Sequence, residues 1–177
     1  SPRDGERDGQ DYRFVDAETF GAMVDADEFA EWVEVHGNRY GTSRRAIEDA
    51  TRAGRAVLLD IDVQGARQLR AVYPQAVTVF LMPPSPVVLE KRLAARGTEA
   101  AADLALRLRT ACREIAEAQS YDHVIVNDQL AEAAGDLRSL LLGSLDRKPR
   151  HGPDQVRALV EAFGETQVHR HAELVSA

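Results

Sequence analysis

A pair of acidic residues at the end of an apolar run is the first feature of this sequence that could support chemistry. Residues 56–59 are Ala-Val-Leu-Leu; Asp60 and Asp62 come next, ahead of Gln64-Gly65 and a helical pattern. A short apolar run without polar alternation predicts a strand covered on both faces, as in parallel α/β sheets, where ligands bind beyond the carboxyl ends of the strands. We therefore expect one or both aspartates to face a ligand, a metal ion or the edge of a base. The alternative is that both are ordinary strand-end carboxylates in water.

A second group of polar side chains gathers in the first 42 residues of the chain. It consists of Arg3, Glu6, Tyr12, Glu31, Tyr40 and Thr42. Guanidinium and phenol groups donate directional hydrogen bonds that suit phosphate oxygens. A carboxylate such as Glu31 suits the paired N–H donors of a guanine edge. Each of these residues alone is also compatible with an ordinary polar surface.

Three arginines form a third candidate group. Arg92 and Arg96 are four residues apart and share one face of a predicted helix, and Arg107 comes from the following helix. Converging positive charges are costly without an anion, so the group suits phosphoryl transfer, in which guanidinium groups stabilise the moving phosphoryl group. The competing interpretation is a solvated arginine stripe paired with neighbouring glutamates.

These side chains need a framework to position them, and the chain pattern predicts an α/β one. Strands are expected at 12–15, 55–61, 76–82 and 121–126, and a small antiparallel lobe at 29–42 with a turn at Gly37-Asn38. Helices are expected at 17–25, 44–53, 64–73, 99–119 and 130–142, and between the cap Ser85 and Gly97. Asp16 and Ser43 are the expected N-caps of the first two helices. This alternation predicts a three-layer α/β domain with a parallel sheet.

The composition sets limits on the function. With 44% hydrophobic and 29% charged residues, the 177-residue chain suits one soluble domain. Its net charge of -7 argues against general binding to nucleic acid or to an anionic membrane. The single cysteine, Cys112, excludes an internal disulfide framework, and we expect a cytoplasmic location. The charged first residues do not resemble a signal peptide, and a start at Ser rather than Met suggests a trimmed or incomplete chain.

Residues 143–177 differ from the rest of the chain. Residues 148–153, Lys-Pro-Arg-His-Gly-Pro, predict a linker, and residues 154–163 predict one more helix. His169 and His171 stand two residues apart, a spacing that could hold a metal ion, but an exposed, frayed tail is the favoured interpretation.

Six segments, in this order and spacing, make the sequence resemble guanylate kinase. They are EFAEWVEVHGNRYGTS, LLDIDVQGARQLR, FLMPPS, EKRLAARGTE, ALRLRTACREI and YDHVIVND, and the opening SPRDGERDGQDYRFV is similar to the start of that family's nucleoside-monophosphate lobe. The resemblance covers residues 1–142. It implies a P-loop-type α/β core at 43–95 and 120–142, an inserted GMP-binding lobe of mixed α+β structure at 1–42, a helical lid region at 96–119, and a linker and tail at 143–177. It also implies phosphoryl transfer from MgATP to GMP, which gives GDP and ADP.

The same resemblance implies roles for the candidate residues. Arg3, Tyr12 and Tyr40 would hold the GMP phosphate with Glu6 close by, and Glu31, Thr42 and Asp62 would read the guanine. Arg92, Arg96 and Arg107 would form a catalytic phosphate clamp, Asn127 would lie near the ATP adenosine, and Asp60 near the magnesium ion. Which of the two aspartates lies nearer the metal stays open. GMP and ATP are thus the expected partners, and no nucleic acid or membrane is expected.

One motif of that family is missing from these residues. Guanylate kinases carry a first strand and a glycine-rich loop, GxxGxGK[ST], whose backbone N–H groups and lysine cradle the ATP phosphates. No such motif occurs in the 177 residues, so we expect the chain as written to be N-terminally incomplete and catalytically inactive. Two hypotheses remain: a guanylate kinase without its N-terminal part, or a degenerate module that binds a phosphate or phosphopeptide. The lid arginines and both aspartates favour the first, because a pure binding module does not need them.

Overall fold

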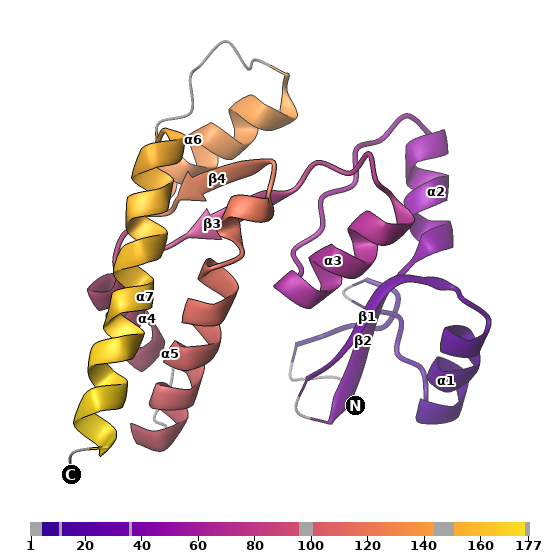
Figure 1. Cartoon of the computed structure of the whole chain (residues 1–177). Coiled ribbons are helices and arrows are strands. Elements are labelled where there is room, and N and C mark those ends of the chain that lie inside the picture. The colour runs from indigo at the N-terminus through magenta and orange to yellow at the C-terminus, as the bar shows by residue number, and fades with distance from the viewer. Residues whose placement is uncertain (1–4, 11, 36, 96–100, 144–150, 176–177) are drawn as a thin grey trace. The chain divides into compact units, whose positions relative to one another are not determined.

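The computed structural model describes residues 5–10, 12–35, 37–95, 101–143 and 151–175. The chain forms two compact units, Ser1–Ala76 (unit 1) and Val77–Ala177 (unit 2). Unit 1 contains helices α1 (Ala17–Asp25), α2 (Arg44–Arg52) and α3 (Val63–Val72) and strands β1 (Phe29–Val35) and β2 (Asn38–Ser43) (Figure 1). Unit 2 contains strands β3 (Val79–Met82) and β4 (His123–Val126), helices α4 (Pro86–Ala95), α5 (Ala101–Ile115), α6 (Leu130–Leu141) and α7 (Pro153–Val175), and the short 3₁₀ helix η1 (Ala118–Ser120). Within the described ranges, no helix combines the length and the apolar character needed to cross a bilayer.

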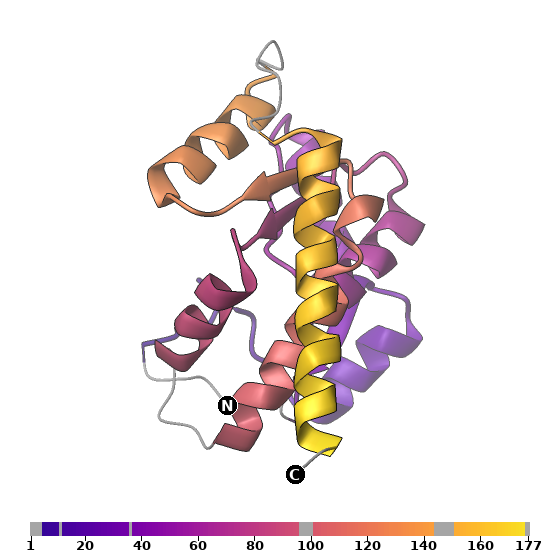
Figure 2. The same ribbon diagram turned by 60° about the vertical axis from the view of Figure 1, so that its left-hand side comes forward.

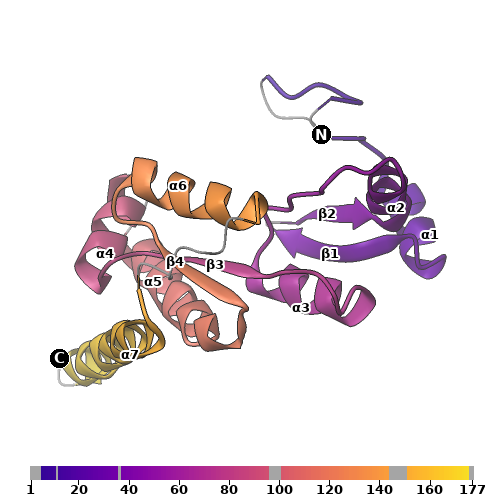
Figure 3. The same cartoon turned by 90° about the horizontal axis from the view of Figure 1, so that it is seen from above.

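Strands β1 and β2 form the antiparallel hairpin that the sequence predicts (Figure 3). Their register pairs Glu31 with Thr42 and Trp32 with Gly41. Because successive side chains of a strand point to opposite faces, Glu31, Thr42 and Tyr40 share one face of the hairpin. The hairpin therefore gathers three of the candidate residues on one side.

The other face of the hairpin packs against α1. A Cβ on Gly41 would come 2.7 Å from the ring of Phe29, so the ring lies directly over the glycine. Phe20 of α1 stacks on Phe29 with ring centroids 4.6 Å apart and planes inclined by 25°. The guanidinium of Arg39 lies 5.1 Å from the centroid of the Phe20 ring. Stacked aromatic rings thus hold α1 to the hairpin, and their close approach requires glycine at position 41.

The helices of unit 1 begin at side-chain caps. Asp16, Ser43 and Asp62 accept hydrogen bonds from the N–H groups of Thr19, Ala46 and Gly65, at 2.7, 3.4 and 2.7 Å. Hydrogen bonds from the side chain and the backbone of Thr19 hold the pKa of Asp16 below its ordinary value. The predicted caps Asp16 and Ser43 are confirmed, and the three predicted helices are confirmed to within one residue at each end. The sequence does not predict the cap at Asp62.

The strand predicted at 55–61 is wrong. This segment connects α2 to α3 without regular structure, and no strand of the described residues pairs with it. Leu58 is 66% exposed, whereas Leu59 and Ile61 pack against a buried cluster that includes Ile47. An apolar run can bury side chains in an irregular segment as well as in a strand. A strand also needs a second strand to satisfy its backbone groups, and the run itself does not provide one.

Strands β3 and β4 pair in parallel, as the α/β prediction requires. Before them, Asp122 Oδ2 accepts hydrogen bonds from the N–H and the hydroxyl of Thr78, at 2.8 and 2.7 Å, and Thr78 Oγ1 accepts one from the Asp122 N–H at 3.1 Å. After them, the N–H of Asn127 donates to the carbonyl of Met82 at 2.7 Å. The parallel pair is therefore fixed at both ends. Ser85 caps α4 directly after β3, as predicted.

Helix α7 is longer than the sequence predicts. We expected a helix at 154–163 and an irregular tail, but one helix covers Pro153–Val175. It packs against α5 (Figure 2), and Val156 and Phe163 are buried in unit 2, at 8% and 0% exposure. Because a helix that has started gains one hydrogen bond for each added residue, packing of the first turns favours continuation beyond the periodic stretch.

Candidate functional site

The hairpin holds a buried carboxyl group with a defined partner. Thr42 lies opposite Glu31 on β2 and donates its hydroxyl to Glu31 Oε1 at 2.5 Å. Glu31 is 5% exposed. A buried polar group is costly unless it is hydrogen-bonded, so this contact both stabilises the group and fixes its direction.

The second oxygen of Glu31 lies against the first turn of α3. A Cβ added at Gly65 would come 2.9 Å from Glu31 Oε2 and 3.4 Å from Asp62 Oδ1. The N–H of Gly65 also donates to Asp62 Oδ1 at 2.7 Å. The carboxyl groups of Glu31 and Asp62 thus both lie at the N-terminus of one helix, where the positive end of the helix dipole favours negative charge.

A cavity of about 840 Å³ lies within unit 1, and Glu6, Tyr12 and Tyr40 are among its lining residues. The rings of Tyr12 and Tyr40 meet edge to face with centroids 5.9 Å apart. The strand predicted at 12–15 is wrong, since only an isolated bridge between Asp8 and Tyr12 forms there. Three of the predicted phosphate-site residues therefore surround one cavity, whose volume is typical of small-molecule sites.

The predicted substrate-binding residues fall into two groups. Glu6, Tyr12 and Tyr40 line the cavity, whereas Glu31, Thr42 and Asp62 form the α3 cluster and are not among its lining residues. Tyr40 connects the groups, because it shares a hairpin face with Glu31 and Thr42. Arg3 lies outside the described residues.

Four arginines, Arg13, Arg39, Arg44 and Arg45, also line the cavity, and two of them connect segments of unit 1. Arg44 donates from Nε to the carbonyl of Phe29 at 2.8 Å and from Nη2 to Asp27 Oδ1 at 2.5 Å. Arg39 donates from Nη2 to the carbonyl of Ala17 at 2.9 Å. The sequence does not single out either residue, and these contacts give both a structural role.

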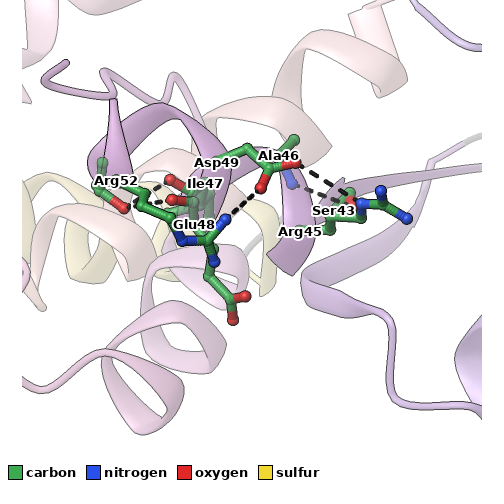
Figure 4. A network of polar contacts seen from close by, with 8 residues as sticks. Ser43, Arg45, Ala46, Ile47, Glu48, Asp49 and Arg52 are labelled. Atoms are coloured by element: carbon green, nitrogen blue, oxygen red, sulfur yellow. Dashed lines mark hydrogen bonds and ion pairs between the residues drawn. The ribbon is translucent and has the colours of Figure 1, made fainter. Parts of the chain in front are cut away.

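A network of charged side chains on α2 differs from the buried pair of Glu31 and Thr42, because its ion pairs lie on an exposed helix (Figure 4). Asp49 accepts from Arg52 at 2.6 Å, and the Arg45 Nε lies 3.6 Å from its other oxygen. These pairs are one turn apart on an exposed helix. Such pairs contribute little, because water can replace either partner.

In unit 2, the structure brings two predicted residues together. Arg92 of α4 donates to the carbonyl oxygens of Asn127 and Asp128, at 2.7 and 3.2 Å. These carbonyls follow β4, at the edge where parallel sheets bind their ligands. Arg107 lies half-buried on α5, and Arg96 lies outside the described residues.

Asp60, predicted near the metal ion, is exposed in the segment between α2 and α3. In the described parts of the chain, no three His, Cys, Asp or Glu side chains gather as a metal site. The side chains of His169 and His171 lie outside the described residues. A magnesium ion that arrives with a nucleotide takes one or two carboxylates besides phosphates and water, so the single carboxylate of Asp60 fits that donor set.

Guanylate kinases are among the known proteins similar to this chain. The family model for guanylate kinase matches residues 1–143. The guanylate kinase of Dechloromonas aromatica (strain RCB) is 50% identical over 143 residues, which cover 81% of this chain and 71% of the relative. That of Symbiobacterium thermophilum is 46% identical over 159 residues, which cover 90% of this chain and 75% of the relative.

A solved structure agrees with the sequence relatives. The crystal structure of guanylate kinase from Anaplasma phagocytophilum matches this fold with a TM-score of 0.66 and 34% identity, over 91% of this chain and 78% of that chain. Fold and relatives together define a nucleotide-binding phosphotransferase of the α/β class. Within that class, the chain belongs to the guanylate kinase family, whose members are ATP:GMP phosphotransferases. None of these findings favours a non-catalytic binding module.

Proposed function

We propose that this guanylate kinase binds GMP in unit 1 through the two groups of residues described above. Glu31, Thr42 and Asp62 bind the guanine, and Tyr12, Tyr40 and Arg3 hold its phosphate with Glu6 close by. The observation that carries this proposal is the buried carboxyl group of Glu31, which Thr42 orients through a bond of 2.5 Å. The cavity around the two tyrosines supports the phosphate side of the proposal.

The chemistry of guanine explains the choice of a carboxyl group. Its N1–H and exocyclic amine are adjacent donors, and the two oxygens of Glu31 are matching acceptors. Adenine has an acceptor at N1 and no amine at C2, so its N1/C2 edge would leave these oxygens without two adjacent donors in a poorly hydrated place. That loss costs binding energy, and selection of GMP over AMP follows from it.

For the transfer step, we propose that Arg92, Arg96 and Arg107 stabilise the moving phosphoryl group. Guanidinium groups neutralise the charge on its oxygens, and donors that are already in place need not reorient during the reaction. The bonds from Arg92 to the carbonyls of Asn127 and Asp128 support this role, because they fix its guanidinium near the carboxyl end of β4. The guanidinium has further N–H donors for a phosphate. Asn127 is proposed to lie near the adenosine of ATP.

Magnesium enters this proposal as the ion that accompanies ATP. When bound, it would neutralise phosphate charge. Asp60 is the residue proposed to hold it together with the phosphates, as an exposed carboxylate can. A cytoplasmic location belongs to the same proposal, because a chain with one cysteine has no internal disulfide to form in an oxidising compartment.

Calorimetric titration of the 177-residue chain with GMP and with AMP tests the guanine site. We expect GMP to bind, and we expect the affinity for AMP to be lower by a factor of about ten or more. Glu31→Gln should weaken GMP binding about tenfold, because an amide N–H then faces a guanine donor. Glu34→Gln is the matched control, since it makes the same change at an exposed position of β1. Equal GMP affinity of the wild type and Glu31→Gln would contradict the proposal.

A coupled assay for GDP formation tests the ATP side. The 177 residues contain no GxxGxGK[ST] loop to hold the ATP phosphates, so we expect them alone to bind GMP without forming GDP from MgATP and GMP. Fusion of a strand and loop of that pattern ahead of the chain should produce activity. Activity of the 177 residues alone would show that another part of the chain holds ATP.

A further inference from the structure

The side chain of Gln68 connects helix α3 to strand β1 through two hydrogen bonds. The carboxamide of Gln68 accepts a hydrogen bond from the Trp32 N–H through Oε1 and donates one from Nε2 to the Trp32 carbonyl, both at 3.0 Å. Gln68 thus pairs with the backbone of β1 as a neighbouring strand would. Trp32 directly follows Glu31, so the double contact fixes the backbone beside the proposed guanine-binding group.

The same side of α3 gives the Glu31 side chain a narrow space. Gly65 stands three residues before Gln68, so the two residues share one face of the helix. A Cβ at position 65 would come 2.9 Å from Glu31 Oε2 and 3.3 Å from the Cβ of Ile61. The end of a flexible side chain can usually move aside. Glu31, however, is 5% exposed, and its other oxygen is bonded to Thr42.

We propose that Gln68 and Gly65 are positioning residues that set the selectivity of this site for guanine. Gln68 fixes the separation of β1 and α3, and Gly65 leaves the gap in which the carboxyl group of Glu31 lies. Neither residue has to touch the nucleotide for this role. The role rests on the proposed function, because it requires Glu31 to bind the guanine edge.

Loss of the Gln68 hydrogen bonds, or of the gap at Gly65, should displace the carboxyl group of Glu31 but leave it in the site. A group displaced by roughly 0.5 Å can still accept one hydrogen bond, but it no longer meets two adjacent donors with good geometry. IMP differs from GMP in lacking the exocyclic amine, so it offers one donor at this edge. Displacement should therefore weaken GMP binding more than IMP binding. The ratio of the two affinities reports the position of Glu31.

The first experiment compares Gln68→Met with Gln75→Met, a matched control at an exposed position after α3. Methionine has a similar length and removes both hydrogen bonds. We expect Gln68→Met to lower GMP affinity about tenfold and IMP affinity much less, whereas Gln75→Met leaves the ratio unchanged. The melting temperature is measured in parallel. A lower melting temperature with an unchanged ratio would mean a purely structural role and would overturn the proposal.

Glu31→Gln in the same titrations separates this role from the proposed function. If that variant leaves the GMP to IMP ratio unchanged, Glu31 does not bind guanine, and both proposals fail. If it lowers the ratio but Gln68→Met and Gly65→Ala do not, the GMP site stands and the positioning role is wrong.

A second experiment tests the gap at Gly65 without a ligand. Alanine in place of a helical glycine normally raises the melting temperature by a few degrees. Gly21→Ala in α1 should do so, because nothing lies within 4 Å of the added Cβ. Gly65→Ala should instead lower the melting temperature, and should lower it less in a Glu31→Ala background, where the close oxygen is gone. A rise equal to that of Gly21→Ala would overturn the proposal.

If the double variant Glu31→Ala/Gly65→Ala does not fold, the titrations of the single variant test the same role. The single variant Gly65→Ala should lower the ratio of GMP affinity to IMP affinity. The added Cβ would lie 2.9 Å from Glu31 Oε2 and should displace this oxygen. An unchanged ratio in a folded Gly65→Ala variant would contradict the positioning role.

Discussion

Helices α2 and α3 begin alike but lie in different surroundings. Each starts after an extended residue whose side chain caps the first turn, Ser43 for α2 and Asp62 for α3. Among the α2 residues only Ile47 is buried, whereas α3 buries several, among them Gly65 and Leu69. The same local signal therefore precedes a surface helix and a helix packed against the proposed guanine site.

The charged residues near the two helices differ in the same way. On α2, Asp49 is paired with Arg45 and Arg52, and all three side chains are more than half exposed. Beside α3, Glu31 is buried with Thr42 as its partner. Water replaces a lost partner at an exposed pair, but it does not reach a buried one. Burial, rather than the number of charges, thus indicates where substitutions should matter.

The largest effect is expected for Thr42→Val, which removes the hydroxyl of the buried pair at nearly constant volume. An unsatisfied buried polar group costs about 1–3 kcal/mol, so the free energy of unfolding, measured with urea, should fall by that amount. GMP binding should weaken in parallel. Thr42→Ser keeps the hydroxyl and is the control. A valine variant as stable as the serine variant would show that the pair is not decisive.

A smaller effect should distinguish the two caps. Replacement of a capping side chain by alanine costs about 1 kcal/mol, so Asp62→Ala and Ser43→Ala should both lower the free energy of unfolding. Ser43→Ala should cost less, because its bond is longer, 3.4 Å against 2.7 Å. Only Asp62→Ala should weaken GMP binding in a titration. Equal losses of affinity in both variants would mean that stability alone controls binding.

A still smaller effect is expected for Asp49→Asn on α2. Exposed ion pairs on a helix contribute about 0.3–0.5 kcal/mol and are screened by salt. The fall in the free energy of unfolding should therefore be slight, and it should disappear at about 1 M salt. A cost above about 1 kcal/mol would show that exposure is a poor guide on this helix.

The smallest effect concerns the exposed cap of α1. Because Thr19 holds the pKa of Asp16 below its ordinary value, this carboxyl group contributes stability that is present above its ordinary pKa. That contribution is lost as the pH falls below about 4 and through the lowered pKa. Asp16→Asn should thus make the free energy of unfolding less dependent on pH in that acidic range. Identical pH profiles of the two proteins would contradict the role of this cap.

Local signals were sufficient wherever a structure depends on neighbours in the chain. The caps Asp16 and Ser43 and the turn at Gly37, whose φ is +76°, were all predictable on that ground. The strand at 55–61 was not, because pairing depends on a second strand elsewhere in the chain. The prediction that the apolar side chains of this segment lie in the core holds for Leu59 and Ile61, which pack against the buried cluster.

The candidate site was predictable by residue type rather than by arrangement. The resemblance selected Glu31, Thr42 and Asp62, but it did not indicate that Asp62 caps α3 or that Glu31 meets the same turn. Gln68 and Gly65 were not selected, because a glycine and a glutamine three residues apart are unremarkable in a helix. Their importance depends on Trp32, which lies 36 residues from Gln68 in the sequence.

Residue order alone established the guanylate kinase family, through segments that match over residues 1–143, and it established caps and turns. Packing between distant segments established that Arg92 meets the carbonyls beyond β4, that Phe163 is buried in unit 2, and that Gln68 pairs with β1. A cap needs the right side chain three residues from its N–H group, so the chain itself sets the distance. A contact between two elements depends on how whole helices and strands pack. A local pattern of residue types does not determine the distance between residues of different elements.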